Sequence, residues 1–159
     1  MSEPLSEGPK KQAMITSLRL LAATPKSRSE LARRLREKNY PEEVISETLN
    51  DLEKKGFLSD QAFAENVKAK YLHGKPSGSK RIDFELKRRG ISGALREKVL
   101  SEISPEDEKE RAREIGLLRW SKHEKLEPEK RKKRVYDFLI RRGFDFSLAR
   151  DLIEEFERL

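Results

Sequence analysis

The chain has 159 residues, of which 41% are charged and 35% are hydrophobic, and its formal net charge is +7. This length fits one domain or a short array of small units, and it is too short for a large catalytic barrel. The absence of cysteine excludes disulfides, thiolate metal ligands and cysteine nucleophiles. The basic excess favours an anionic partner, which could be nucleic acid, a membrane surface or an acidic protein groove.

The sequence indicates neither a membrane segment nor an export signal. No window approaches the ~18 apolar residues that a membrane-spanning helix needs. The first 20 residues lack a charged region followed by an apolar region and a cleavage site. We therefore expect a cytoplasmic protein with no membrane partner.

Taken in chain order, the sequence predicts a short lead followed only by helices. Residues 1–10 contain two prolines, one glycine and no apolar periodicity, so we expect a disordered N-terminal lead. From there onward apolar residues recur at helical spacing, and no segment alternates as a strand would. Ser27 and Glu30 form a capping-box pattern at the start of one helix. Glycines after basic helix ends predict left-handed caps at Gly74, Gly90 and Gly143.

Internal repetition is the most informative feature of the sequence. Segments 31–52, 82–103 and 135–156 can be laid over one another with offsets of 51 and then 53 residues. The matching apolar positions are Leu31, Ile82 and Val135; Leu35, Leu86 and Leu139; Tyr40, Ile91 and Phe144; Val44, Leu95 and Leu148; and Leu49, Leu100 and Ile153. Each segment therefore predicts two helices joined by a tight turn, at Asn39, Gly90 or Gly143.

A further amphipathic stretch precedes each helix pair, so each unit is predicted to contain three helices. The apolar residues of these stretches are Ile15, Leu18 and Leu21; Phe63, Val67 and Tyr71; and Ile115, Leu118 and Trp120. A unit of about 50 residues buries little surface alone, so neighbouring units must stack. The predicted fold is all-α, an elongated and curved tandem array of three-helix repeats at residues 11–58, 59–104 and 105–159.

Helix-turn-helix DNA-binding domains are also built from three helices, and their last helix enters the major groove. Here the last helix of the first unit carries five acidic residues between Glu42 and Glu53, and that of the third unit carries four between Asp151 and Glu157. DNA phosphates repel acidic helices. Only the middle unit, with Arg96 and Lys98, could approach a groove, so sequence-specific reading is disfavoured.

The positive charge lies on other helices, at matching positions of two repeats. The net charge is +4 over residues 60–91 and +5 over residues 122–142. We predict a cationic stripe that binds an anionic partner and consists of Arg81, Lys87, Arg88, Arg89, Lys130, Arg131, Lys132, Lys133, Arg134, Arg141 and Arg142. The alternative is a solvated helical face with pairs such as Glu129 and Lys133.

No catalytic, metal-binding or cofactor pattern is found, so we expect a protein that is not an enzyme. His73 and His123 lie among lysines near helix ends and have no HExxH-type companion. The loop at residues 74–80 lacks the GxxxxGK[ST] order and a preceding strand, which argues against nucleotide binding by a phosphate loop. Trp120, Tyr136 and Phe144 follow the apolar spacing and are expected in the core rather than stacked on bases.

Four segments in the same order resemble signatures of the RecX family. The central one is GSKRIDFELKRRGI at residues 78–91, with a glycine, then R-I, E-L, a basic pair and G-I. The others are SRSELARRL at 27–35, GFLSDQAFA at 56–64 and RRGF at 141–144. The resemblance covers nearly the whole chain from about residue 14. It departs from the pattern at Asn39-Tyr40, where the family has glycine before an apolar residue.

The resemblance implies a bacterial regulator that binds the RecA recombinase filament on single-stranded DNA and restrains strand exchange and co-protease activity. It implies a role in DNA repair, homologous recombination and the SOS response. It also implies a modular three-helix array lodged in the filament groove. We expect a monomer whose stripe contacts the filament, DNA or both. The alternative is a basic helical nucleic-acid-binding module that acts independently of RecA.

Overall fold

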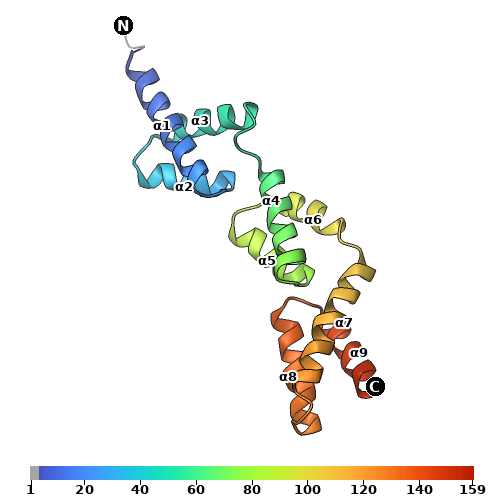
Figure 1. The fold of residues 1–159 in the computed structure, drawn as a ribbon. Coiled ribbons are helices and arrows are strands. Elements are labelled where there is room, and N and C mark those ends of the chain that lie inside the picture. The colour runs from blue at the N-terminus through green and yellow to red at the C-terminus, as the bar shows by residue number, and fades with distance from the viewer. Residues whose placement is uncertain (1–3) are drawn as a thin grey trace. The chain divides into compact units, whose positions relative to one another are not determined.

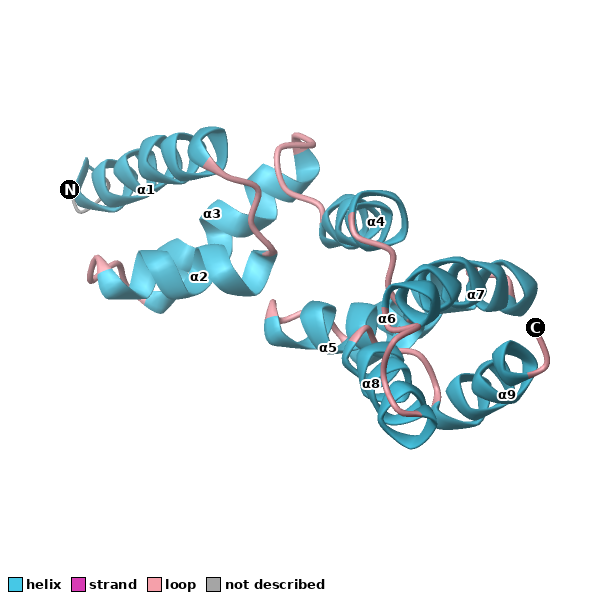
Figure 2. Cartoon of the chain, turned by 60° about the horizontal axis from the view of Figure 1, so that its bottom comes forward, coloured by secondary structure: helices cyan, strands magenta, loops and turns pink. Residues whose placement is uncertain are grey.

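The computed structural model describes residues 4–159, and within them it contains helices and connecting loops but no strand (Figures 1 and 2). The helices are α1 (Pro4–Ala23), α2 (Arg28–Glu37), α3 (Glu42–Lys54), α4 (Asp60–Ala69), the π-helical η1 (Lys70–Gly74), α5 (Ser79–Arg88), α6 (Gly93–Ser101), α7 (Pro105–Lys122), α8 (Pro128–Arg141) and α9 (Phe146–Glu157). With η1 as the continuation of α4, they form three sets of three. The predicted all-α class and tandem three-helix repeats are confirmed.

The first two sets of matching apolar positions have the same environment in all three repeats. Leu31, Ile82 and Val135 are fully buried, and so are Leu35, Leu86 and Leu139. The predicted turn residues also share a left-handed backbone, with φ of 66° at Asn39, 81° at Gly90 and 87° at Gly143. Asparagine tolerates this conformation better than most residues, so it replaces glycine in the first repeat. Gly74 was predicted to be left-handed as well, but it ends η1 without a positive φ.

The start of the chain differs from the prediction. Helix α1 begins at Pro4, although a disordered lead was expected to continue to residue 10, and residues 1–3 lie outside the described part. Lys10 Nζ lies 2.8 Å from the Asp51 carboxylate of α3, and Ala13 is fully buried. These tertiary contacts stabilise the helix where sequence periodicity gives no signal.

The described chain divides into two compact units. Unit 1 contains the chain up to Ala64 and Arg88–Ser92, and unit 2 contains Glu65–Lys87 and Gly93–Leu159. One hydrophobic cluster lies among α1, α2 and α3 in unit 1, and another lies among α7, α8 and α9 in unit 2. The middle repeat is shared between the units. The limits of the compact units therefore do not coincide with the predicted limits of the repeats. The repeat limits and the curvature of the array stay predictions.

Two large apolar residues expected on buried stripes lie in solvent. Ile15 is 49% exposed and Leu118 is 69% exposed. Helices α1 and α7 bury small residues instead: Ala13 and Ser17 in α1, and Ala112 and Gly116 in α7. Small side chains let neighbouring helices approach closely. The large residues beside them then stay outside the contact.

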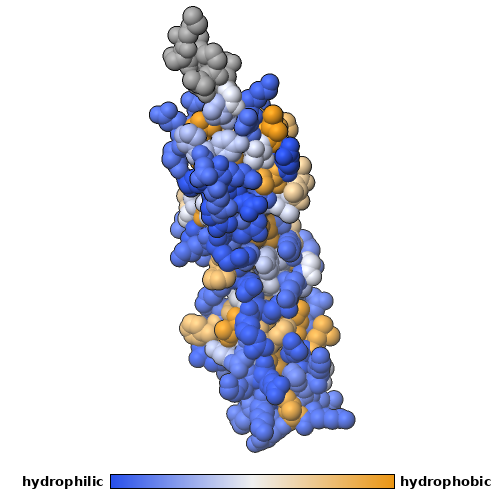
Figure 3. All heavy atoms as spheres, turned by 90° about the vertical axis from the view of Figure 1, so that its left-hand side faces the viewer, coloured by the Kyte–Doolittle hydropathy of each residue, from blue (hydrophilic) through white to orange (hydrophobic). Residues whose placement is uncertain are grey.

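The face drawn in Figure 3 is mostly hydrophilic, with apolar side chains in small scattered groups. None of the helices in residues 4–159 combines the length and the apolar character needed to cross a bilayer.

Candidate functional site

The same docking contact occurs twice in the chain, once inside each unit. At the first junction, residues 27–30 at the start of α2 contact the turn at residues 89–90. Ser27 Oγ donates a hydrogen bond to the Arg89 carbonyl, and Arg89 Nε lies 2.8 Å from a Glu30 carboxylate oxygen. At the second junction, residues 76–81 contact the turn at residues 142–143. Gly78 N–H donates to the Arg142 carbonyl at 2.8 Å.

The residues at the two junctions correspond in the repeat alignment. Ser27 corresponds to Gly78 and Glu30 to Arg81, with an offset of 51 residues, whereas Arg89 corresponds to Arg142 with an offset of 53. The acid that faces the arginine at the first junction is therefore replaced by a base at the second. This reversal determines the electrostatics of the two sites.

The first junction is electrically neutralised. Burial alone would raise the pKa of Glu30, but the hydrogen bonds from Arg89 and Ser27 outweigh it and hold the pKa below its usual value. The Arg89 guanidinium also lies 4.8 Å from the centre of the Phe63 ring. Arg89 is thus occupied by contacts within unit 1.

The second junction leaves its arginine charge uncompensated. Arg142 Nε donates to the Pro76 carbonyl at 3.0 Å, and its Nη2 donates to the same oxygen. A carbonyl satisfies hydrogen bonds but carries no formal charge. Burial, together with repulsion from Arg119 and Arg81, lowers the pKa of Arg142 below its usual value. Positive charge is therefore crowded at this point.

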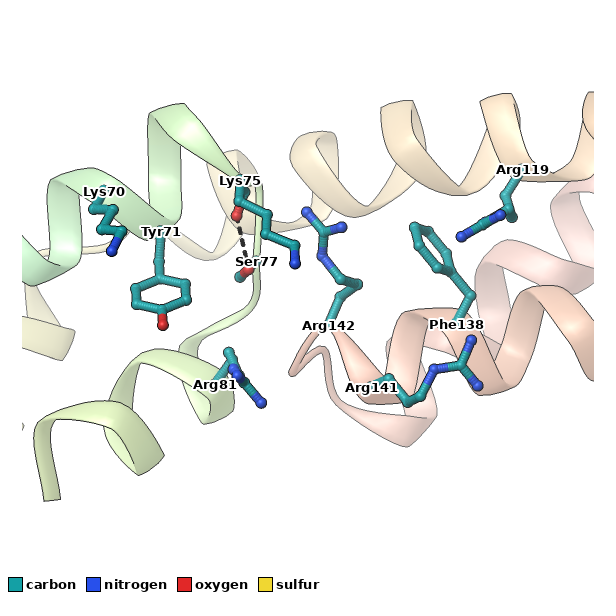
Figure 4. A pocket seen from close by; sticks show the side chains of 9 residues that line it. All are labelled: Lys70, Tyr71, Lys75, Ser77, Arg81, Arg119, Phe138, Arg141 and Arg142. Atoms are coloured by element: carbon teal, nitrogen blue, oxygen red, sulfur yellow. Dashed lines mark hydrogen bonds between the residues drawn. The ribbon is translucent and has the colours of Figure 1, made fainter. Parts of the chain in front are cut away.

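A cavity of about 460 Å³ opens at the second junction (Figure 4). We call it the cationic cavity, and it is lined by Lys70, Tyr71, Lys75, Ser77, Arg81, Arg119, Phe138, Arg141 and Arg142. Six of these nine side chains are basic and none is acidic. Figure 4 shows Lys75 and Arg142 pointing toward each other across the cavity. Such an arrangement attracts anions and repels cations by its electrostatic potential.

Local backbone structure positions the cavity side chains. The π-helical turn η1 carries Lys70 and Tyr71, and its last hydrogen bond runs from Lys75 N–H to the Lys70 carbonyl at 3.2 Å. Ser77 is 2% exposed and donates to the Lys75 carbonyl at 2.8 Å. The next residues are held at α7, because the Ser79 hydroxyl donates to Glu108 at 2.8 Å. The loop is thereby fixed on both sides.

Two glycines allow the two segments of the second junction to touch. A Cβ at Gly78 would overlap the backbone of Gly143, and a Cβ at Gly143 would overlap Arg81. Without side chains at these positions, Lys80 N–H reaches the Gly143 carbonyl at 3.2 Å. The close approach brings Arg81 beside Arg141 and Arg142.

The predicted cationic stripe separates into several environments. Arg81, Arg141 and Arg142 line the cationic cavity, and Arg141 also lines a second hollow with Lys130, Lys133, Arg134 and Asp137. Lys87 and Arg88 are exposed at the end of α5 and belong to the linings of neither hollow.

Two members of the basic run in α8 have structural contacts. Arg131 donates two hydrogen bonds to the Trp120 carbonyl, at 3.0 and 2.8 Å, and its guanidinium lies 3.8 Å from the centre of the Trp120 ring. Lys132 forms ion pairs with Glu129 at 3.2 Å and Glu157 at 3.0 Å. The run therefore holds unit 2 together as well as presenting charge.

Sequence reasoning missed Lys70, Tyr71, Lys75, Ser77 and Arg119 as site residues. None of them belongs to a basic run, and they come from three separate segments. The repeated turn pattern was the available signal, because it marks where segments dock.

The two histidines and the aromatic residues considered for base stacking lie outside the cationic cavity. His73 is exposed in η1, and His123 is the C-cap residue of α7. Slight burial and the neighbouring Arg119 and Arg134 lower the pKa of His123. Within residues 4–159 no three His, Cys, Asp or Glu side chains are placed to hold a metal ion. Trp120 and Phe144 are buried, as predicted, and Tyr136 is partly buried against the core of unit 2.

Fold and site together define a class: an all-helical repeat protein whose clustered cations fit an anionic partner. Residues 13–52 match the model of the RecX first three-helix domain, and residues 94–153 match that of the RecX third three-helix domain. The regulatory protein RecX of Streptomyces coelicolor is 31% identical over 147 residues, which cover 92% of this chain and 78% of that protein. The regulatory protein RecX of Mycobacterium sp. strain KMS is 35% identical over 158 residues, covering 96% and 84%. The chain belongs to the RecX family.

Solved structures agree on the fold. The crystal structure of RecX from Lactobacillus salivarius superposes with a TM-score of 0.86 at 19% identity, covering 96% of this chain and 99% of that one. A second crystal structure, of a regulatory protein RecX, gives a TM-score of 0.80 at 22% identity, covering 95% and 74%.

Proposed function

We propose that the protein regulates RecA by binding, without catalysis, to the RecA filament on single-stranded DNA, and thereby limits strand exchange and co-protease activity. The observation that carries the proposal is membership of the RecX family, whose matched relatives are named regulatory proteins over most of this chain. The cationic cavity supports it, because a nucleoprotein filament offers anionic surface and phosphate.

Exposure and ion pairing refine the set of residues proposed to touch the filament. Arg81, Lys130, Arg134 and Arg141 are exposed, and among the described residues no carboxylate lies within ion-pair distance of them. We add Lys87, Arg88 and Lys133 as exposed members of the original stripe. Arg89, Arg131 and Lys132 are assigned structural roles instead, since each is held by contacts inside the protein.

The test is the ATPase rate of a bacterial RecA on single-stranded DNA, titrated with this protein from far below one copy per RecA. We expect inhibition at concentrations too low to coat bare DNA. The double variant K130Q/R134Q should weaken inhibition and flatten its salt dependence, because two exposed cations are lost. The matched control is K54Q/K55Q, which removes two exposed lysines of unit 1 and should inhibit normally. Unchanged inhibition by K130Q/R134Q would show that these residues do not touch the filament.

The second candidate is a nucleic-acid-binding module that acts without RecA. The cationic cavity favours it, since its lining contains six basic side chains that can pair with phosphate. Inhibition that begins only once bare DNA is saturated would support this candidate and contradict RecA regulation. Groove reading by α3 or α9 stays disfavoured, because acidic residues are exposed on both helices.

A further inference from the structure

The cationic cavity gathers several cations that have no acidic partner around one hollow. Other cations of the described surface pair with carboxylates, as Lys68 does with Glu102 at 2.6 Å and Lys10 with Asp51 at 2.8 Å. Apart from Arg142, the cavity has five cations, all exposed or partly exposed: Lys70, Lys75, Arg81, Arg119 and Arg141. Among residues 4–159, no carboxylate lies within ion-pair distance of any of these five. Cations crowded without counter-charge raise the free energy of the empty site and favour anion binding.

The cavity is built by contacts that hold its walls before any ligand arrives. Gly78 N–H bonds the Arg142 carbonyl at 2.8 Å, and Arg142 Nε bonds the Pro76 carbonyl at 3.0 Å. The Arg119 guanidinium lies 4.3 Å from the centre of the Phe138 ring, which fixes the opposite wall. The π-helical turn that carries Lys70 is a rare form that occurs frequently at functional sites. Arg119 and Arg142 are therefore held before a ligand arrives, and side chains that are already held lose little entropy on binding.

Size and charge together select the kind of anion. A hollow of about 460 Å³ falls in the range of small-ligand sites, roughly 300–1,000 Å³. A nucleic-acid strand carries one negative charge per phosphate, and in a duplex these charges follow each other about every 3.4 Å of helix axis on each strand. A polyphosphate chain instead concentrates three or four negative charges on adjacent phosphorus atoms. Six basic groups around one small hollow match that concentrated charge better than one or two backbone phosphates.

We infer that the cationic cavity of unit 2 binds a polyphosphate anion, such as the triphosphate chain of a nucleotide. Lys70, Lys75, Arg81 and Arg119 pair with the phosphate oxygens, and Arg141 completes the charge. The partly buried Tyr71 ring lies on the same lining and offers a flat face to a ribose or base. The loop at residues 74–80 supplies Lys75 but is not a phosphate loop, because it lacks the GxxxxGK[ST] order. The binding needs neither RecA nor DNA.

Titration calorimetry of the full chain, without RecA, DNA or magnesium, tests the inference with sodium tripolyphosphate, ATP and orthophosphate. We expect saturable one-to-one binding of tripolyphosphate and ATP, and orthophosphate binding weaker by on the order of tenfold or more. The variant K70Q/K75Q should weaken tripolyphosphate binding by on the order of tenfold, because two charge-assisted contacts are lost. The control K54Q/K55Q makes the same chemical change in unit 1 and should bind like the original protein.

Three results would overturn the inference. The first is no saturable tripolyphosphate binding by a protein whose circular dichroism shows the expected helix. The second is equal weakening in both double variants, which would indicate diffuse attraction by net charge. The third is binding of a single-stranded oligonucleotide that depends on Lys70 and Lys75 but is not displaced by tripolyphosphate, which would make the cavity a strand site. Because no RecA is present, any of these results leaves the ATPase test of the proposed function intact.

Discussion

The two junctions contain an arginine at the same repeat position, yet that arginine has opposite roles. Arg89 meets the Glu30 carboxylate at 2.8 Å, so its charge is neutralised inside unit 1. Arg142 meets a carbonyl, with Arg81 standing where the first junction has its acid. One acidic-to-basic difference therefore turns a structural ion pair into a cationic cavity. The arginine position of the repeat thus determines where two segments dock. The residue that faces the arginine determines whether its charge is neutralised.

The largest expected effect comes from adding a methyl group at the two junction turns. G143A should lower the free energy of unfolding by about 3 kcal/mol, because φ is +87° and the new Cβ overlaps the Arg81 backbone. G90A should lower the free energy of unfolding by about 1–2 kcal/mol, because φ is +81° but the new Cβ overlaps only the Ser29 side chain and no backbone atom. Urea unfolding followed by circular dichroism measures both. The control G93A adds a methyl group that meets nothing nearer than Arg96 Nη2 at 4.0 Å. Equal losses at Gly90 and Gly143 would contradict the difference between the junctions.

The substitution R81E should give the second junction the same ion pair as the first. In R81E the new carboxylate takes the place that Glu30 has at the first junction and can pair with Arg142. We expect tripolyphosphate binding to fall by on the order of a hundredfold, because one cation is lost and one anion is added. The unfolding midpoint should stay the same or rise, since the new pair relieves cationic repulsion. Retained affinity in R81E, measured by the same calorimetry, would place the anion elsewhere; R81Q should show an intermediate loss.

The smallest expected effect is the acid sensitivity that Asp145, which pairs with Lys80 at 2.9 Å beside the second junction, gives to unit 2. The Ser147 hydroxyl, Lys80 and the Ser147 N–H hold the pKa of Asp145 at about 2, below its usual 3.8. A carboxyl whose pKa is lower in the folded state stabilises the fold above pH 3.8, and this stabilisation is lost as the pH falls through 2. Trp120 fluorescence should therefore report unit 2 unfolding more easily between pH 4 and pH 2. D145N should remove that part of the pH dependence, and an identical acid profile for D145N would refute the assignment.

Apolar spacing was sufficient to predict the repeats. Leu31, Ile82 and Val135 sit at equivalent helical positions and are all fully buried, because a helix can hide only the face on which such residues recur. The same reasoning failed at Ile15 and Leu118, which are exposed. There the small residues Ala13 and Gly116 mark the contact, and small residues carry little hydrophobic signal.

The candidate site was predicted only in part. The basic pair before Gly143 is visible in the sequence, and both of its arginines line the cavity. Lys70, Lys75 and Arg119 are isolated cations whose meeting depends on the π-helical turn and the Gly78 contact. Arg131 shows the opposite failure, because a run of five cations gave no sign that one of them would bond Trp120.

By itself the sequence determined the helical class, the repeat, the left-handed turns and the family, since all of these follow from local periodicity and from motif order. Only the tertiary structure decided which charges remain available to a partner. Charge is a property of a residue, but its neutralisation depends on what faces it across a junction. Glu30 faces Arg89, whereas Arg81 stands beside Arg142, and these neighbours are separated by about 60 residues in the chain.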